Sequence, residues 1–261
     1  MRTADYLTRL GVADLPPLTC PFDPGYDAGT LEGHLDQSAT LMSELKISMA
    51  CWLVADESVT RRKVAAARAH GVPTITGGGP FEIAVARGVL PDYLDLCADV
   101  GMSRVECGRG FTDMALSPEQ VVGMAHQRGL GVEAELGSKH DGAFGGQAVS
   151  ELIEEGRAWL DAGAERLIIE ARESAVAVGL FDAAGRFNAP QADRFVDALG
   201  LDVLIFEAPV KSSQFRLLDH FGAGVRLSNV RLEELLRVEI YRRGLHSDAF
   251  GNPRLRPGGT G

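Results

Sequence analysis

Four glutamates stand at the carboxyl ends of short aliphatic runs, at similar intervals along the chain. The strings are Arg-Val-Glu106, Val-Glu-Ala-Glu135, Leu-Ile-Ile-Glu170 and Leu-Ile-Phe-Glu207, separated by 29, 35 and 37 residues. A carboxylate at the end of a buried strand is costly unless it is paired, hydrogen-bonded or bound to a metal. If the four side chains converge, they could hold a hard divalent cation such as Mg²⁺. They could instead form ion pairs that knit the fold together.

Basic side chains lie close to the same positions: Lys46, Lys139, Arg172 and Lys211. Lys139 belongs to the polar, glycine-flanked segment 137–142, which is typical of a mobile loop over a site. Its ammonium could act as an acid or contact a phosphate, and it could equally be a solvated surface lysine. Ser228 and Asn229 follow the last aliphatic run and suit helix caps or anion donors. The glycine run 77–79 allows either a close backbone approach to a ligand or a tight turn.

The intervals between the glutamates each match the size of one strand–helix unit. Ser117-Pro118-Glu119-Gln120 predicts a helix start with a capping box, and the helix should end near Gly129. Further helices are predicted after Asp56, ending at Gly71, and over 147–163. Other predicted strands are Leu18–Phe22, Leu45–Leu53, Pro73–Thr76 and Val225–Val230.

Strict alternation of apolar strands with helices indicates a parallel sheet that is covered on both faces. Eight such repeats in about 250 residues favour closure into a (β/α)₈ TIM barrel. The length suits a single barrel domain over 1–250, with a flexible tail over 251–261. An open doubly wound sheet is the alternative, but no strand is followed by a dinucleotide-binding glycine motif or a P-loop. In such barrels the reactive groups lie at the carboxyl ends of the strands, where the four glutamates stand.

The chain has 261 residues and a formal net charge of −10, from 26 basic and 36 acidic side chains. Nucleic acid and anionic membranes are therefore disfavoured as partners, because binding them needs clustered basic residues. The longest apolar stretch, 47–55, is far below the roughly 20 residues that span a bilayer. The four cysteines form no C-x-x-C motif, which fits a reducing compartment. We expect a cytoplasmic protein, and a homo-oligomer because such barrels often associate.

Taken in order, these strings resemble the phosphosulfolactate synthase family of coenzyme M biosynthesis. The residues that carry the resemblance are Gly77-Gly78 with Phe81-Glu82, Glu106, Glu135 with Gly137 and Lys139, Glu170-Ala171-Arg172-Glu173-Ser174, Phe206-Glu207-Ala208-Pro209, Lys211, Gln214, Leu227 with Asn229, Glu239, Arg242, Gly244-Leu245 and Asp248. The resemblance implies a (β/α)₈ barrel and Mg²⁺-dependent addition of sulfite to phosphoenolpyruvate. Sulfite would attack the methylene carbon, and negative charge would develop on the substrate carboxylate as an enediolate.

The resemblance also implies roles for individual residues. Glu135, Glu170 and Glu207 would bind the metal or support its ligands. The catalytic residues would be Lys139, Arg172 and Glu135, with Lys139 delivering a proton or contacting phosphate. The small anionic substrate would be bound by Lys46, Arg109, Lys211, Gln214, Ser228 and Asn229.

Several strings depart from the family pattern at loops near the mouth of the barrel. Where the family has Asp-Lys-Gly, this chain has Asp23-Pro24-Gly25, and the family's Lys-Phe-Gly-Trp-Gly-Thr is replaced over 46–51. The family's Ser-Asp-Gly has become Gly108-Arg109-Gly110, and the second position of its Gly-Lys-Lys is Ser138. A relative with a different nucleophile or substrate is thus an alternative.

Two other classes stay open. One is a non-catalytic stress or scaffold protein, although a scaffold needs no charged groups at one end of the strands. The other is an aldolase that forms a Schiff base on Lys46, Lys139 or Lys211.

Overall fold

The structure is a computed structural model that describes residues 1–47 and 49–255. Eight parallel strands form a closed ring in which each strand pairs with its neighbours in the chain and β8 returns to β1. The strands are β1 (Thr19–Asp23), β2 (Leu45–Ile47), β3 (Thr74–Thr76), β4 (Arg104–Cys107), β5 (Gly131–Leu136), β6 (Arg166–Ile169), β7 (Leu204–Glu207) and β8 (Arg226–Arg231). The predicted single-domain (β/α)₈ barrel is confirmed.

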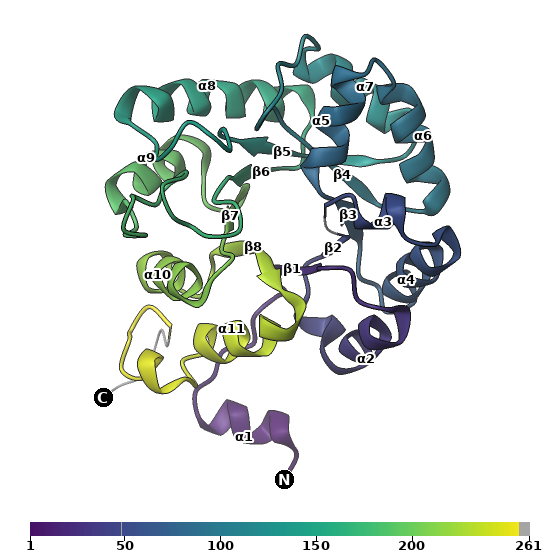
Figure 1. Cartoon of the computed structure of the whole chain (residues 1–261). Coiled ribbons are helices and arrows are strands. Elements are labelled where there is room, and N and C mark those ends of the chain that lie inside the picture. The colour runs from purple at the N-terminus through teal and green to yellow at the C-terminus, as the bar shows by residue number, and fades with distance from the viewer. Residues whose placement is uncertain (48, 256–261) are drawn as a thin grey trace.

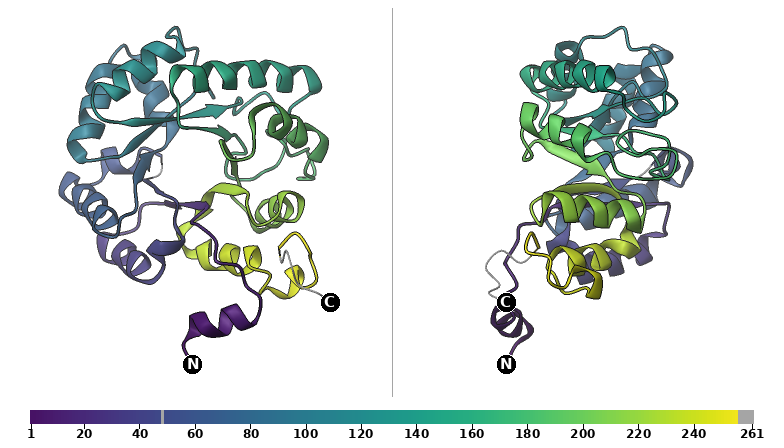
Figure 2. Two further views of the ribbon diagram at one scale, coloured as in Figure 1. Left: turned by 180° about the vertical axis from the view of Figure 1, so that it is seen from behind. Right: turned by 90° about the vertical axis from the view of Figure 1, so that its left-hand side faces the viewer.

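Helices surround the ring of strands (Figure 1). They are α2 (Ala28–Ser38), α4 (Glu57–Ala69), α5 (Gly78–Ala86), α6 (Leu90–Val100), α7 (Pro118–His126), α8 (Gly146–Ala162), α9 (Ala189–Leu199), α10 (Lys211–Phe221) and α11 (Leu235–Arg242). Shorter turns of helix are α3 (Cys51–Val54), η1 (Ala39–Leu41), η2 (Leu232–Glu234) and η3 (Ser247–Ala249). The amino-terminal helix α1 (Thr3–Arg9) buries no residue and projects away from the ring (Figure 2). None of the described helices has the length and hydropathy needed to cross a bilayer.

Successive side chains of the strands point alternately outward, into an apolar layer beneath the helices, and inward, into a charged barrel interior. On β5, Val132, Ala134 and Leu136 are fully buried in the apolar core beneath the helices. Successive side chains of a strand point to opposite faces, so Glu133 and Glu135 lie inside the barrel. The strand pairing aligns Glu106 with Glu133, which places Glu106 on the same inner face. The barrel interior is therefore lined by carboxylates that need partners.

The predicted helix starts agree with the structure. Ser117 and Gln120 form the predicted capping box of α7, and the Asp56 side chain caps α4. The predicted strand over Leu45–Leu53 is wrong in its second half. β2 ends at Ile47 and α3 begins at Cys51; Ser48, between them, lies outside the described residues. An apolar run cannot by itself distinguish a strand from a buried helical turn, and here it buries Trp52 from a helix.

Two further expectations concerned the cysteines, which were predicted to form no disulfides, and residues 251–261, which were predicted to be a flexible tail. Cys20, Cys51, Cys97 and Cys107 are all free thiols. In the predicted tail, Asn252 donates to Asp219 over 2.9 Å and Leu255 is buried against the core. Residues 256–261 of that tail lie outside the described residues.

Candidate active site

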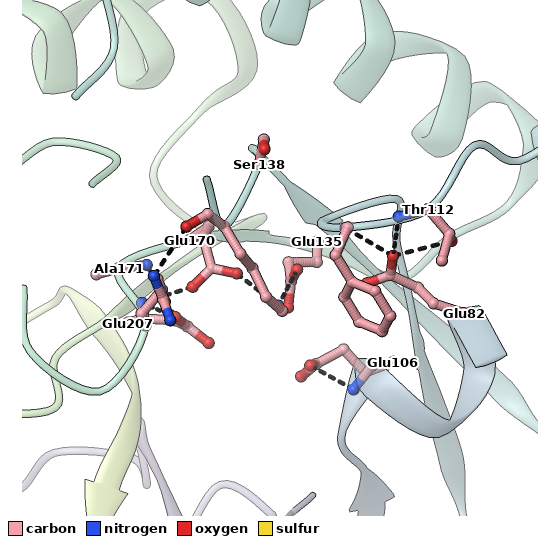
Figure 3. A network of polar contacts seen from close by, with 12 residues as sticks. Glu82, Glu106, Thr112, Glu135, Ser138, Glu170, Ala171 and Glu207 are labelled. Atoms are coloured by element: carbon pink, nitrogen blue, oxygen red, sulfur yellow. Dashed lines mark hydrogen bonds and ion pairs between the residues drawn. The ribbon is translucent and has the colours of Figure 1, made fainter. Parts of the chain in front are cut away.

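A cavity of about 1180 Å³ opens at the carboxyl ends of the strands. All four strand-end glutamates line it, together with Lys46, Lys139, Arg172 and Asn229. Figure 3 shows the carboxylates approaching one another from successive strands. The sequence prediction that these side chains converge is thus confirmed by the geometry, because parallel strands present their carboxyl ends at one mouth.

Lys139 lies between two of the glutamates. Its Nζ is 2.8 Å from Glu135 Oε1 and 2.6 Å from Glu170 Oε2. The Lys139 backbone N–H donates to the Gly110 carbonyl over 2.8 Å, which fixes the loop after β5 against the loop after β4. Burial alone would lower the pKa of Lys139, but the two glutamates outweigh burial and raise it. Lys139 is therefore a protonated group at neutral pH.

Lys46 of β2 is likewise held by carboxylates, from within its strand and deeper than Lys139. Its Nζ is 2.6 Å from Glu106 Oε2, 2.9 Å from Asn229 Oδ1 and 3.8 Å from Glu207 Oε1. The ammonium is almost fully buried, and the carboxylates of Glu106 and Glu207 overcome the burial and raise its pKa. Lys46 thus ties β2 to β4, β7 and β8 through charge-assisted contacts.

Backbone groups complete the surroundings of Glu207. Its Oε2 accepts hydrogen bonds from the backbone N–H groups of Ala171 (2.8 Å) and Arg172 (3.0 Å), and its Oε1 accepts from Asn229 Nδ2 (2.5 Å). Arg172 and Asn229 both have positive φ angles, of 54° and 53°. Such strained backbone persists where surrounding contacts determine it, and it is frequent in functional sites.

The three glutamates proposed as metal ligands have unequal proton affinities. Burial and the neighbouring charge of Glu170 raise the pKa values of Glu135 and Glu207 well above their ordinary range. Burial would also raise the pKa of Glu170, but the Lys139 ammonium prevails and lowers it to about 2. Like charges this close cannot all be ionised unless a proton or a cation is shared among them.

The site offers the donors that a hard divalent cation prefers, but not a finished set of ligands. No group of three His, Cys, Asp or Glu side chains within residues 1–47 and 49–255 is arranged to hold a metal ion. The two lysines compensate only half of the formal charge of the four glutamates. The remaining formal charge of −2 and the oxygen donors suit Mg²⁺ chemically, although among the described residues the carboxylates are not arranged around a common point.

A glycine allows the first turn of α5 to approach the carboxylates. The Gly78 backbone N–H donates to Glu106 Oε1 over 2.8 Å. A Cβ atom at Gly78 would lie 3.1 Å from that oxygen and 3.5 Å from Glu135 Oε2. The glycine run after β3 therefore serves a close backbone approach at the start of a helix.

The remaining predicted binding residues do not line the mouth. Arg109 pairs with Glu155 of α8 over 2.8 Å. Lys211 begins α10, pairs with Asp248 over 3.6 Å and lines a separate hollow on the outside of the barrel. Gln214 bonds Glu234 and the Ala208 carbonyl. Ser228 is buried, with no partner for its Oγ among the described residues. The short connection from β7 turns α10 outward, so its first residues leave the cavity.

Glu82 of α5 had no predicted role in the site and does not line the cavity, yet it binds the loop after β4 that borders the cavity. It is fully buried, and its Oε2 accepts from Phe111 N (2.9 Å), Thr112 N (3.0 Å) and Thr112 Oγ1 (3.1 Å). A Cβ at Gly110 would lie 2.9 Å from Glu135 Oε1, 3.1 Å from Lys139 Nζ and 3.2 Å from Glu82 Oε1. Figure 3 shows Glu82 bound to Thr112 of this loop, on the side of the loop next to Glu135. Glu82 thus holds the loop after β4 beside the Lys139–Glu135 pair.

Replacing Glu82 by glutamine is expected to lower kcat by about 10–100-fold with little change in KM, because a small displacement of a reacting group costs rates of that order. A glutamine oxygen can still accept from the loop, but its NH₂ group would then face the Lys139 ammonium. Steady-state kinetics measures the effect, and Glu151→Gln on the exposed face of α8 is the matched control. A wild-type kcat in Glu82→Gln would contradict the positioning role.

The fold and the mouth define the class of protein: a (β/α)₈ barrel with a charged cavity at the carboxyl ends of its strands. Among solved structures, the chain is similar to KGPDC from Streptococcus mutans (TM-score 0.55, 9% identity, covering 93% of this chain and 96% of that one). It is also similar to the YdjI aldolase from Escherichia coli (TM-score 0.53, 16% identity, 97% and 88% covered). At these identities the likeness shows the fold alone.

Sequence comparison gives the family. The family model of (2R)-phospho-3-sulfolactate synthase (ComA) matches residues 17–248. The phosphosulfolactate synthase of Methanocaldococcus jannaschii is 31% identical, with 90% of this chain and 94% of that protein covered. That of Methanothermobacter thermautotrophicus is 27% identical, with 98% and 100% covered. The chain belongs to the phosphosulfolactate synthase family and is a lyase-type enzyme that forms carbon–sulfur bonds.

Proposed function

We propose that the enzyme catalyses Mg²⁺-dependent addition of sulfite to phosphoenolpyruvate. The observation that carries the proposal is the Lys139 ammonium, which is held between Glu135 and Glu170 and lines the cavity. It stands beside Arg172, whose guanidinium donates to the Lys139 carbonyl over 3.0 Å. A proton donor beside a cationic anion-binding group is what conjugate addition to an enol phosphate requires.

Residues of the chain have separate tasks in this proposal. Glu135, Glu170 and Glu207 would hold Mg²⁺, which when bound supplies Lewis-acid stabilisation of charge on the substrate carboxylate. Arg172 binds a substrate anion from the rim of the cavity. Lys139 delivers a proton to the carbon beside the carboxylate after the new carbon–sulfur bond forms. The phosphate is retained, so the reaction needs no phosphoryl acceptor.

The geometry opposes the Schiff-base alternative. A lysine must lose its proton to attack a carbonyl. Paired glutamates raise the pKa values of both Lys46 and Lys139, although burial acts in the opposite direction, and Lys211 lies outside the cavity. Borohydride trapping with carbonyl substrates should therefore leave the protein unmodified.

The proposed reaction is tested by ³¹P NMR on the purified enzyme with phosphoenolpyruvate, Mg²⁺ and sulfite. We expect a phosphosulfolactate resonance to appear, and its rate to fall at least about 100-fold when EDTA removes the metal. Added Mg²⁺ and phosphoenolpyruvate should also raise the melting temperature, because a ligand that binds the native state stabilises it. Unchanged phosphoenolpyruvate with all components present would overturn the proposal. A melting temperature indifferent to both ligands would favour a non-catalytic protein.

Cytoplasmic location and homo-oligomerisation stay predictions. Cell fractionation and light scattering would test them.

A further inference from the structure

Four cations of the described residues line the mouth cavity: Lys46, Lys139, Arg172 and Arg231. Lys46 and Lys139 are each held by two carboxylates. In the proposed mechanism Lys139 is the proton donor and Arg172 binds one substrate anion. The proposed reactants bring three anionic groups: the carboxylate and the phosphate of phosphoenolpyruvate, and sulfite. With Mg²⁺ on the carboxylate, one oxyanion still needs a cation, and Arg231 is the cavity cation that has no task.

Arg231 is the last residue of β8, and its guanidinium is held on two sides. Its Nε donates to Glu233 Oε1 over 2.6 Å. Its Cζ lies 5.8 Å from the centre of the Phe22 ring, because the pairing of β8 with β1 places these two residues side by side. Within residues 1–47 and 49–255, the hydrogen bonds of this guanidinium use Nε alone. Both Nη groups can therefore donate to a ligand in the cavity.

The Glu233 carboxylate is itself anchored to the loop after β1. Its Oε2 accepts from the Tyr26 hydroxyl over 2.5 Å. The backbone N–H groups of Tyr26 and Gly25 donate to Asp23 Oδ1 over 2.7 and 2.9 Å. The buried Lys63 ammonium lies 2.7 Å from the other oxygen of Asp23. These contacts fix the direction of the Arg231 guanidinium before a ligand binds, and a preorganised group loses less entropy on binding.

The position of this ion pair argues against a role in the fold alone. The side chains of Arg231 and Glu233 are 45% and 41% exposed. Ion pairs with this exposure contribute little to stability. A planar guanidinium with parallel N–H donors suits the recognition of oxyanions, and this one lines the wall of the cavity.

Resting on the proposed addition of sulfite to phosphoenolpyruvate, we propose that Arg231 is a second oxyanion-binding residue of the active site. Its Nη groups bind either the phosphate group of phosphoenolpyruvate or sulfite, and Arg172 binds the other oxyanion from the end of β6. Two separate guanidiniums compensate the repulsion between the two anions, so that both can occupy the cavity together. Contacts to the oxygens of sulfite leave the lone pair of its sulfur free to attack the methylene carbon.

The test measures the two reactants separately in Arg231→Met, whose side chain keeps an apolar contact with Phe22 but cannot donate. Titration calorimetry in the presence of Mg²⁺ gives the Kd of phosphoenolpyruvate. ³¹P NMR at saturating phosphoenolpyruvate gives the KM for sulfite. We expect one of the two constants to rise by about 10–100-fold, the contribution of hydrogen bonds to a charged group. A higher Kd assigns Arg231 to the enol phosphate, and a higher KM assigns it to sulfite.

Glu233→Gln distinguishes ligand binding from the ion pair itself. The variant removes the negative charge beside the guanidinium, so both constants should fall or stay within about twofold of the wild type. An ion pair that only joins β8 to the loop after β1 would instead give Arg231→Met and Glu233→Gln the same effect. The matched control is Arg62→Met on α4, because Arg62 also pairs with a glutamate, Glu32, over 2.6 Å and does not line the cavity. This control should leave both constants unchanged.

The outcomes separate this inference from the function on which it rests. If Arg231→Met forms phosphosulfolactate with both constants unchanged, the role of Arg231 is overturned and the proposed function is supported. Equal losses in Arg231→Met and Glu233→Gln would also overturn that role. If the wild type forms no phosphosulfolactate, the proposed function fails. In that case a Kd of phosphoenolpyruvate that rises in Arg231→Met would still support the oxyanion site, and an unchanged Kd would overturn it.

Discussion

Lys139→Met is expected to lower kcat by about 10²–10⁴-fold, the usual contribution of a positioned general acid. Lys139 Nζ contacts Glu135 and Glu170 within 2.8 Å, beside the anion-binding Arg172, so its loss removes both the proton and the local positive charge. The measurement is ³¹P NMR of substrate consumption under saturating conditions. A variant with a wild-type kcat would exclude Lys139 from the chemistry.

Lys139→Arg distinguishes proton delivery from charge. Arginine keeps a positive charge near the two glutamates but does not release its proton in proteins. If Lys139 delivers the proton, Lys139→Arg stays as slow as Lys139→Met although it is as stable as the wild type. If Lys139 only contacts phosphate, Lys139→Arg regains activity to within about tenfold of the wild type.

The same variants change how stability depends on pH. Against the pull of burial, Lys139 holds the pKa of Glu170 at about 2, below its ordinary value of 4.5. The stabilisation from this depressed pKa is present above pH 4.5 and is lost as the pH falls toward 2. In Lys139→Met, burial raises the pKa of Glu170 instead, so thermal stability should decline with rising pH once Glu170 must ionise. Melting curves between pH 3 and 8 test this sign.

The convergence of the strand-end glutamates could be predicted from sequence for a simple reason. Each closes an aliphatic run, and the closure of a parallel barrel brings the ends of all such runs to one mouth. Lys139 was predictable too, because it follows Glu135 by four residues in a glycine-flanked loop. These features depend on local pattern and on one topological rule.

The directions and partners of several side chains could not be predicted from the sequence. Lys211 follows Glu207 by four residues, as Lys139 follows Glu135, yet α10 begins at Lys211 and carries it to the outer surface. Arg109 instead pairs over 2.8 Å with Glu155 of α8, which is 46 residues further along the chain. Glu82 carried a weak signal, a carboxylate on an otherwise apolar turn of α5, but its partners Phe111 and Thr112 are about 30 residues away in sequence. Only the folded loop shows what Glu82 binds.

Lys46→Met is expected to lower the free energy of unfolding by about 3–5 kcal/mol, because it leaves a buried charge without its partner. The side chains of Lys46 and Glu106 are 4% and 3% exposed, and their atoms are 2.6 Å apart. The Glu207 carboxylate is less affected by the loss of Lys46, because it still accepts hydrogen bonds from Asn229 and from two backbone N–H groups. Urea unfolding measures the change. A loss below about 1 kcal/mol, the value typical of exposed pairs, would contradict the argument.

The double variant Lys46→Met/Glu106→Gln separates stability from catalysis. The double variant has no uncompensated carboxylate at position 106. We therefore expect its free energy of unfolding to be at least about 2 kcal/mol higher than that of Lys46→Met. The side-chain amide that replaces the Glu106 carboxylate can still accept from the Gly78 N–H through its oxygen, which preserves the start of α5.

Activity should not return with stability, because the double variant still lacks the ammonium that orients Asn229 and Glu207 beside the substrate. Full recovery of both stability and kcat would show that Lys46 serves the fold alone. Recovery of stability without kcat would show that one buried ion pair both holds the strands together and sets the electrostatics of the mouth.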